Sequence, residues 1–119
     1  MVGLGGGIGS IARYLSQKWF SENVSTSFPW GTFAVNLAGC FLIGIIYAAS
    51  EKTSIISPQV KMLLITGFCG GFTTFSAFAF ENMNLLRAGD ILYFMIYIIA
   101  SIVLGVGGVF AGIAIVKLL

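Results

Sequence analysis

The chain of 119 residues has very little charge, no histidine and only two prolines. Charged residues make up 8% of it, whereas about a quarter of the residues of a soluble protein are charged. With 58% apolar residues and a mean hydropathy of +1.02, the sequence excludes a soluble domain of this size. Because histidine and any carboxylate cluster at metal-ligand spacing are both absent, zinc and redox-metal chemistry are not expected. We therefore expect an integral membrane protein.

The apolar residues occur in continuous stretches and do not alternate with polar ones. The stretches cover about residues 2–20, 30–50, 59–87 and 91–117. Each is long enough for the roughly 20 residues that a spanning helix needs, whereas strands of an outer-membrane barrel are shorter and alternate. The sequence predicts an all-α membrane protein with one domain, residues 1–119, and four transmembrane helices. No basic region precedes the first stretch, so it is not expected to be a cleaved signal peptide.

Turn-forming residues mark the connections between these stretches. Pro29 and Pro58 suit the first turn of the helices that follow them. Gly89 and Asp90 form the shortest connection, in which the glycine is expected to end one helix and the aspartate to begin the next. The four stretches should therefore run up and down as near neighbours.

Lysine and arginine are balanced between the two sides that an even number of spans creates. The two sets are Lys52, Lys61 and Lys117 on one side, and Arg13, Lys18 and Arg87 on the other. The positive-inside rule needs an imbalance to choose an orientation, and three against three provides none. We expect the chain to insert into the bilayer both ways up.

The small size of the chain points to an assembly. Four helices of about 20 residues would fill their interior with their own side chains, so a transport route is expected between subunits. Pairs of small residues spaced by four allow helices to approach closely in lipid. These pairs are Gly3/Gly7, Gly5/Gly9, Gly67/Gly71 and Gly108/Gly112. An antiparallel homodimer satisfies the charge balance, the size and the packing together.

Polar side chains inside spans are costly and are functional candidates by default. Asn36 either donates hydrogen bonds to a passing anion or only joins two helices. Arg13 either snorkels to the headgroups as an anchor or lines a vestibule that concentrates anions. Glu81 is either a proton carrier or a structural acid that pairs with a helix terminus or with Arg87. For each of these residues, both roles agree with the sequence.

The third stretch contains adjacent glycines followed by adjacent threonines, a pattern that weakens a helix. If the helix unwinds there, the carbonyls of Gly70 and Thr73 lose their partners and must find a proton or a cation. Broken helices in transporters hold sodium with carbonyls freed in this way. In an antiparallel dimer, two such breaks would meet on the two-fold axis and offer four oxygens to one small hard cation.

Aromatic and hydroxyl residues flank this break. Phe72, Phe75 and Phe78 recur at intervals of three, which is typical of plain apolar packing. Phenylalanine also has a positive ring edge, which stabilises an anion without trapping it. Tyr97 and Ser101 lie four residues apart on one helix face, where they either line a polar track or form a packing hydrogen bond.

Three motifs together resemble the Fluc/CrcB family of microbial fluoride channels, over essentially the whole chain. They are Gly-Gly-x-Gly-Ser-x-x-Arg-Tyr at residues 6–14, Gly-Thr-x-x-Val-Asn-x-x-Gly at residues 31–39, and Gly-x-Cys-Gly-Gly-Phe-Thr-Thr-Phe-Ser at residues 67–76. The third motif is the specific one.

The resemblance implies a dual-topology homodimer with two antiparallel pores and a central structural sodium ion. Fluoride would leave the cytoplasm passively through it, which reduces fluoride toxicity. The expected location is the inner or plasma membrane, with several passes, and neither an enzymatic activity nor a nucleic-acid partner is expected.

The resemblance also assigns residues. Phe75 and Phe78 would be the paired pore phenylalanines, Asn36 the pore amide, and Gly70 and Thr73 the backbone ligands of sodium. The less secure matches to the polar track are Thr74, Ser76, Tyr97 and Ser101, with Arg13 in the first motif as the vestibule candidate. Gly105 stands one turn beyond Ser101, so a hydroxyl is missing where the track would continue.

Two other classes fit less well. A small dual-topology, proton-coupled multidrug exporter needs a carboxylate in its first span, and residues 2–20 contain none. An assembly or scaffolding subunit would explain the helices and glycines, but it would not explain the break between phenylalanines and threonines.

Overall fold

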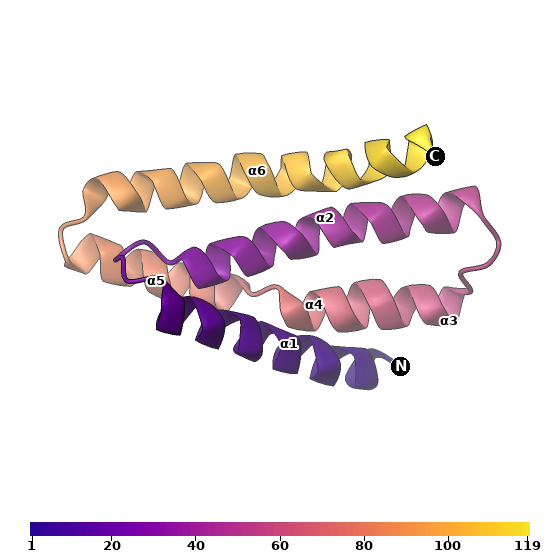
Figure 1. Cartoon of the computed structure of the whole chain (residues 1–119), viewed down its shortest axis with the longest axis horizontal. Coiled ribbons are helices and arrows are strands. Elements are labelled where there is room, and N and C mark those ends of the chain that lie inside the picture. The colour runs from indigo at the N-terminus through magenta and orange to yellow at the C-terminus, as the bar shows by residue number, and fades with distance from the viewer.

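The computed structural model describes all 119 residues, and every regular element in it is a helix (Figure 1). The elements are α1 (Val2–Asn23), α2 (Trp30–Lys52), α3 (Pro58–Lys61), the π-helix η1 (Met62–Cys69), α4 (Gly70–Phe72), α5 (Phe75–Arg87) and α6 (Ile91–Leu118). Their ends lie within three residues of the apolar stretches in the sequence. The prediction of an all-α protein is confirmed.

Three helical segments are long and apolar enough to cross a membrane, so the protein is a multi-pass membrane protein. These segments are Trp30–Lys52, Pro58–Arg87 and Ile91–Leu118. The 23 residues of α2 extend about 35 Å, which exceeds the ~30 Å hydrocarbon core of a bilayer. Helix α1 has 22 residues but is not among the three, because it carries Arg13, Lys18, Glu22 and five glycines. A fourth span remains a prediction.

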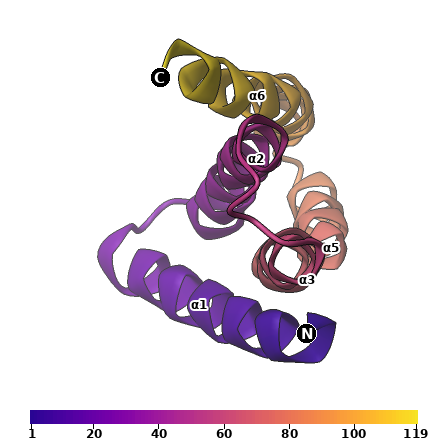
Figure 2. The same cartoon turned by 90° about the vertical axis from the view of Figure 1, so that its right-hand side faces the viewer.

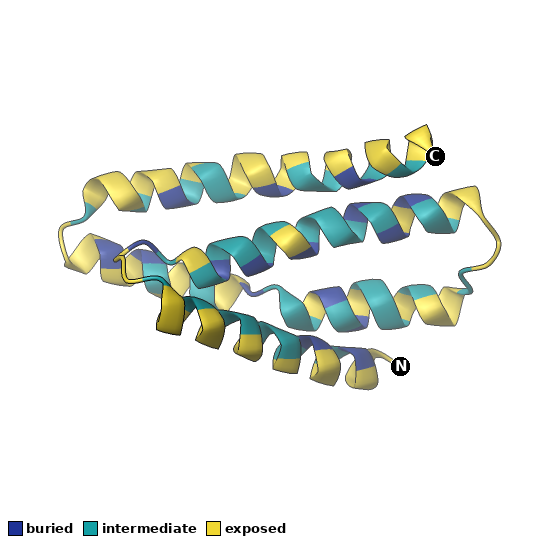
Figure 3. Ribbon diagram, in the orientation of Figure 1, coloured by how far each residue is buried: buried dark blue, intermediate teal, exposed yellow.

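Helix α2 lies in the middle of the bundle. Seen along the long axis, α6 packs on one side of α2, while α1 and the α3–α5 segment lie on the other (Figure 2). The few buried residues face between the helices, and the outer faces are exposed along their length (Figure 3). Exposed apolar faces of this kind fit a lipid surrounding.

Glycines set the distance between α1 and the third segment. A Cβ added at Gly5 would overlap the backbone carbonyl of Leu63, and one added at Gly9 would overlap that of Phe68. Two of the predicted glycine pairs, Gly5/Gly9 and Gly67/Gly71, therefore face each other within one chain. The pair Gly3/Gly7 has nothing within 4 Å of its added Cβ atoms, so this pair has no partner inside the chain.

The predicted break in the third segment is present, but it lies later than the glycines. Gly70 and Gly71 are still helical, and the chain becomes extended at Thr73 (ψ 158°) and Thr74 (ψ 122°). The predicted interruption is therefore confirmed, and the two threonines carry it. Gly71 instead gives close contact with the backbone of Gly6, and the β-branched threonines take the extended conformation that suits them.

The turn between α5 and α6 has the form that its sequence predicts. Gly89 has a φ of 81°, a conformation that disfavours other residues. Its N–H donates to Leu86 O (3.2 Å), and the Asp90 N–H donates to Leu85 O (2.9 Å), which is a Schellman motif. Asp90 is the N-cap residue of α6, although its side chain makes no capping hydrogen bond.

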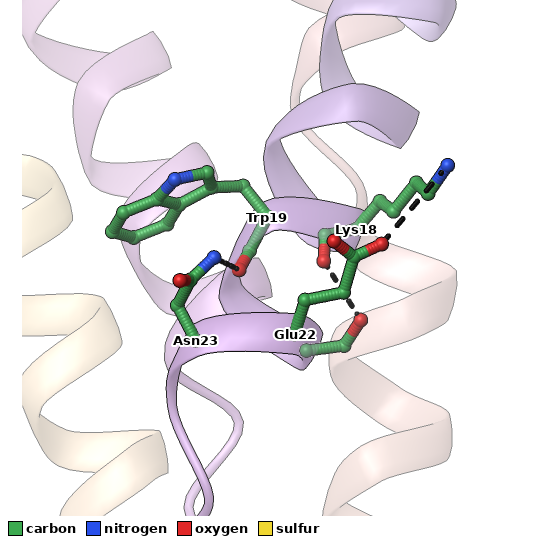
Figure 4. A network of polar contacts seen from close by, with 5 residues as sticks. Lys18, Trp19, Glu22 and Asn23 are labelled. Carbon is green, nitrogen blue, oxygen red and sulfur yellow. Dashed lines mark hydrogen bonds and ion pairs between the residues drawn. The ribbon is translucent and has the colours of Figure 1, made fainter.

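The C-terminal end of α1 is held by local polar contacts (Figure 4). Asn23 Nδ2 donates to the carbonyl of Trp19 (2.8 Å), and Lys18 Nζ lies 4.0 Å from Glu22 Oε1. The ion pair is exposed, so it contributes little stability. The loop that follows brings Phe28 into a buried cluster with Leu85 and Tyr97.

We expect Gly9→Ala to destabilise the protein by about 1–3 kcal/mol, because the new methyl group overlaps the Phe68 carbonyl and α1 must move away from η1. Gly7→Ala is the matched control in the same helix, since nothing lies within 4 Å of its added Cβ. Thermal unfolding of the purified protein in detergent, followed by circular dichroism, measures the difference. Equal melting temperatures for the two variants would contradict this packing.

Candidate functional site

A cavity of about 300 Å³ opens beside the break in the third segment. Helix α2, the break itself, α5 and α6 all contribute to its wall. The lining residues are Asn36, Cys40, Ile43, Thr73, Thr74, Phe75, Phe78, Ser101 and Ile102. Six of them are residues that the sequence predicted as site residues: Asn36, Thr73, Thr74, Phe75, Phe78 and Ser101. Residues far apart in the sequence therefore meet at one place in the fold.

The side chain of Asn36 bridges α2 and the break. Its Oδ1 accepts a hydrogen bond from the Thr74 N–H (2.8 Å), and its Nδ2 donates to the Thr74 carbonyl (3.1 Å). Both backbone groups of an extended residue are thus satisfied, which is what an apolar environment demands. Asn36 makes the interhelical bond that was one of its two interpretations. Its second amide N–H has no partner within the chain, and the residue also lines the cavity.

The caps at the break release two carbonyls. In a continuous helix the Thr74 N–H would bond to Gly70 O, and the Ala77 N–H would bond to Thr73 O. The first donor goes instead to Asn36, and the second goes to Thr74 Oγ1 (3.2 Å). The carbonyl oxygens of Gly70 and Thr73 are therefore left without their usual donors. Neutral backbone oxygens suit a small hard cation, so the two residues fit the predicted role.

The two phenylalanines differ in their surroundings. Their ring centroids are 5.8 Å apart and the rings are tilted by 42°. Phe78 packs on the ring of Tyr97 (4.8 Å between centroids) and is partly buried, whereas Phe75 is 78% exposed. Phe78 is therefore held in place by its own chain, while most of the Phe75 side chain has no contact within the chain.

A chain of hydrogen bonds joins four helices next to this cavity. Tyr97 donates its hydroxyl to Glu81 Oε1 (2.9 Å), and Thr32 donates its hydroxyl to Glu81 Oε2 (2.9 Å). Gln17 Nε2 in turn donates to Thr32 Oγ1 (2.9 Å). Two of these donors reach the carboxylate directly, and the third donates to the Thr32 hydroxyl. Glu81 thus pairs with hydroxyl groups, and the alternative in which it pairs with Arg87 is wrong.

Four of the predicted site residues lie outside the cavity. Tyr97 is fully buried and uses its hydroxyl on Glu81, although Ser101, one turn later, reaches the cavity. Ser76 is exposed with its Oγ 3.3 Å from Thr74 Oγ1. Gly70 is exposed, and Arg13 is half-buried on α1 without an ion pair or a hydrogen bond from its side chain. The single chain therefore assembles only part of the predicted site.

The family model described as "CrcB-like protein, Camphor Resistance (CrcB)" matches residues 1–113. The chain belongs to the CrcB-like family. Its curated relatives include a protein of Leptospira interrogans serogroup Icterohaemorrhagiae serovar copenhageni that is 49% identical over 117 residues, which is 98% of this chain and 92% of the relative. A relative from Flavobacterium psychrophilum is 47% identical over 116 residues (98% and 94%), and one from Rhizobium etli is 44% identical over 119 residues (100% and 95%). All three are named "Fluoride-specific ion channel FluC".

Sequence reasoning missed two residues of this CrcB-like site. Thr32 lies four residues before Asn36, so both fall on one face of α2, and this spacing inside the second motif was the available signal. Gln17 gave no signal beyond being a polar residue in the first apolar stretch. Both residues are linked to Glu81, because Thr32 donates to its carboxylate and Gln17 donates to Thr32. These contacts depend on how α1, α2 and α6 pack.

We expect Asn36→Ala to lower the free energy of unfolding by about 1–3 kcal/mol, because it leaves the Thr74 N–H and carbonyl without partners in an apolar setting. Hydrogen exchange of the backbone amides of residues 73–77 should accelerate at the same time. Ser50→Ala is the control, since it removes an exposed hydroxyl that bonds only to Tyr47 O in its own helix. Unchanged exchange in Asn36→Ala would show that the amide does not hold the break.

Proposed function

We propose that this CrcB-like chain is an ion channel that lets fluoride leave the cytoplasm passively and so reduces fluoride toxicity. The observation that carries the proposal is the name shared by relatives at 44–49% identity over nearly the whole chain. The cavity beside the break supports it, because it combines one free amide N–H, a serine hydroxyl and two phenylalanine rings. None of the groups lining this cavity is a nucleophile paired with a base, so the arrangement suits permeation more than catalysis.

The chemistry of the cavity suits a small anion. Asn36 and Ser101 supply neutral hydrogen-bond donors, and the edges of Phe75 and Phe78 carry partial positive charge. No lysine or arginine lines the cavity, so an anion would be stabilised without being held tightly. Conduction needs binding of this weak, repeated kind. Thr74 in the cavity and the exposed Ser76 beside it would continue the polar surface, while the hydroxyl of Tyr97 stays on Glu81. Arg13 would draw anions toward a vestibule.

We propose that the working unit is an antiparallel homodimer with four spans in each chain and two pores. The exposed ring of Phe75 and the open glycines Gly3 and Gly7 are surfaces that a second copy would cover. The balance of lysine and arginine permits both orientations in the inner or plasma membrane. Helix α1 would be the fourth span, with Gln17 turned to Thr32 of α2 and with Gly5 and Gly9 against η1.

We further propose a structural sodium ion at the breaks. The carbonyls of Gly70 and Thr73 would hold it, and two chains would supply four oxygens. Its positive charge would compensate the carbonyl dipoles that the interrupted helices leave without donors. The competing exporter is not favoured, because residues 2–20 lack the carboxylate it needs and the relatives carry a channel name.

In liposomes loaded with potassium fluoride, we expect fluoride efflux that accelerates when valinomycin relieves the potassium potential. Phe75→Ile and Phe78→Ile should each reduce this flux about tenfold, because each removes a positively polarised ring edge from the path of the anion. A tenfold loss corresponds to a barrier raised by about 1.4 kcal/mol. Phe80→Ile is the matched control, since Phe80 lies on the same helix but does not line the cavity. A fluoride electrode measures the rate. If all three variants conduct fluoride at the same rate, the two rings serve only for packing. If the wild-type protein releases chloride as fast as fluoride, the proposed fluoride selectivity is wrong.

For sodium, we expect protein purified into sodium-free N-methylglucamine buffer to retain one ion per two chains, measured by elemental emission. Asn36→Leu should release it, because the break loses the two hydrogen bonds that hold Thr74 extended and so position the Gly70 and Thr73 carbonyls. Ser50→Ala should retain it. Wild-type protein without sodium would refute the site while leaving the flux prediction standing.

A further inference from the structure

The net charge of the chain is concentrated at one end of the bundle. The last turns of α2 and α6 and the start of α3 lie together there (Figure 1). This end holds Lys52, Lys61 and Lys117 against a single acid, Glu51, which gives three positive charges less one, or +2. The remaining charged residues are Arg13, Lys18 and Arg87 with Glu22, Glu81 and Asp90, and they sum to zero. The two sides therefore have equal numbers of lysine and arginine residues but unequal numbers of acidic residues.

A groove of about 650 Å³ lies between α2 and α6 at the same end. Its apolar residues are Tyr47, Ala48, Phe110, Ile113 and Val116, and its charged residues are Glu51, Lys52 and Lys117. Along each helix the apolar residues precede the charged ones, so the groove is apolar toward the middle of the bilayer and charged at the end of the helices. This order matches the order of acyl chain and headgroup in a phospholipid.

The ammonium group of Lys52 is held at this end of the groove. Its Nζ donates to the carbonyl of Val116 (3.1 Å) in the last turn of α6. An ammonium has three N–H donors, so two remain for another acceptor. Lys61 reaches the same place from α3, with its Nζ 5.0 Å from the centre of the Tyr47 ring. Lys61 thus adds a second positive charge next to a residue that lines the groove.

We propose that this groove binds one anionic phospholipid, with its phosphate against Lys52 and Lys117 and an acyl chain along Phe110 and Ile113. Basic pockets between membrane helices bind anionic headgroups, and each lysine near the surface contributes about 1 kcal/mol. The excess of positive charge selects an anionic lipid over a zwitterionic one. A soluble anion has no apolar part that could pack against the apolar residues of the groove. The site is separate from the cavity at the break, with which it shares no lining residue.

The first test is native mass spectrometry of the full-length protein in detergent, titrated with dioleoyl phosphatidylglycerol or dioleoyl phosphatidylcholine. We expect tighter binding of the anionic lipid, and we expect the double variant Lys52→Gln with Lys117→Gln to weaken that binding about 30-fold, which is two lysines at about 1 kcal/mol each. The control is Lys18→Gln with Arg87→Gln, which removes the same charge at the other end. Equal affinity of the wild-type protein for the two lipids, or equal loss in both double variants, would overturn the proposal.

The second test fills the groove without changing its charge. Ile113→Trp should reduce the bound anionic lipid by one molecule, whereas Val103→Trp, on an exposed part of α6 outside the groove, should not. The mass spectrum reports the oligomeric state in the same measurement. If Ile113→Trp separates subunits instead of displacing lipid, the groove is covered by a second copy of the chain and the lipid proposal is wrong. Circular dichroism of each variant checks that the helices are intact.

Discussion

The structure depends on the two hydrogen bonds between the Asn36 side chain and the backbone of Thr74. An extended residue in the middle of a spanning segment exposes an N–H and a carbonyl that lipid cannot satisfy. One amide side chain satisfies both, at 2.8 and 3.1 Å. Because the Thr74 N–H is used in this way, the Gly70 carbonyl is released, and the cavity forms where the helix is interrupted. The stabilising contact and the candidate site are therefore the same feature.

Close packing of backbones makes this contact reachable. Gly39, three residues after Asn36 on α2, leaves room for the methyl group of Thr73, which a Cβ at that position would overlap. On the other side, Gly5 and Gly9 let α1 approach η1. The break is thus held between two helices that come close only because glycines face it. Farther along the chain, the Glu81 carboxylate accepts hydrogen bonds from one hydroxyl group in α2 and one in α6. The second of these bonds holds the ring of Tyr97 against Phe78.

Much of this could be predicted from the sequence because membrane helices obey local rules. Long apolar runs defined the helices, and Gly89 defined the turn before α6, since both depend on residues that are neighbours in the chain. The interruption after Gly71 was predictable for the same reason, but its position was not. Glycine permits both unwinding and close contact, and only the approach of Gly6 to Gly71 shows that contact is the role here. The hydrogen-bond partners of Glu81 were missed because they come from two other helices, α2 and α6.

By itself the sequence determined the membrane class, the limits of the helical segments to within three residues, the presence of an interruption and the residues around it. It did so because apolar length, turn residues and motif spacing are properties of the chain alone. Only the tertiary structure decided that Asn36 caps Thr74, that Thr73 and Thr74 rather than the glycines are extended, and that Tyr97 points to Glu81 and away from the cavity. Those outcomes depend on which hydrogen-bond donors and acceptors meet across packed helices, and residue order does not specify such meetings.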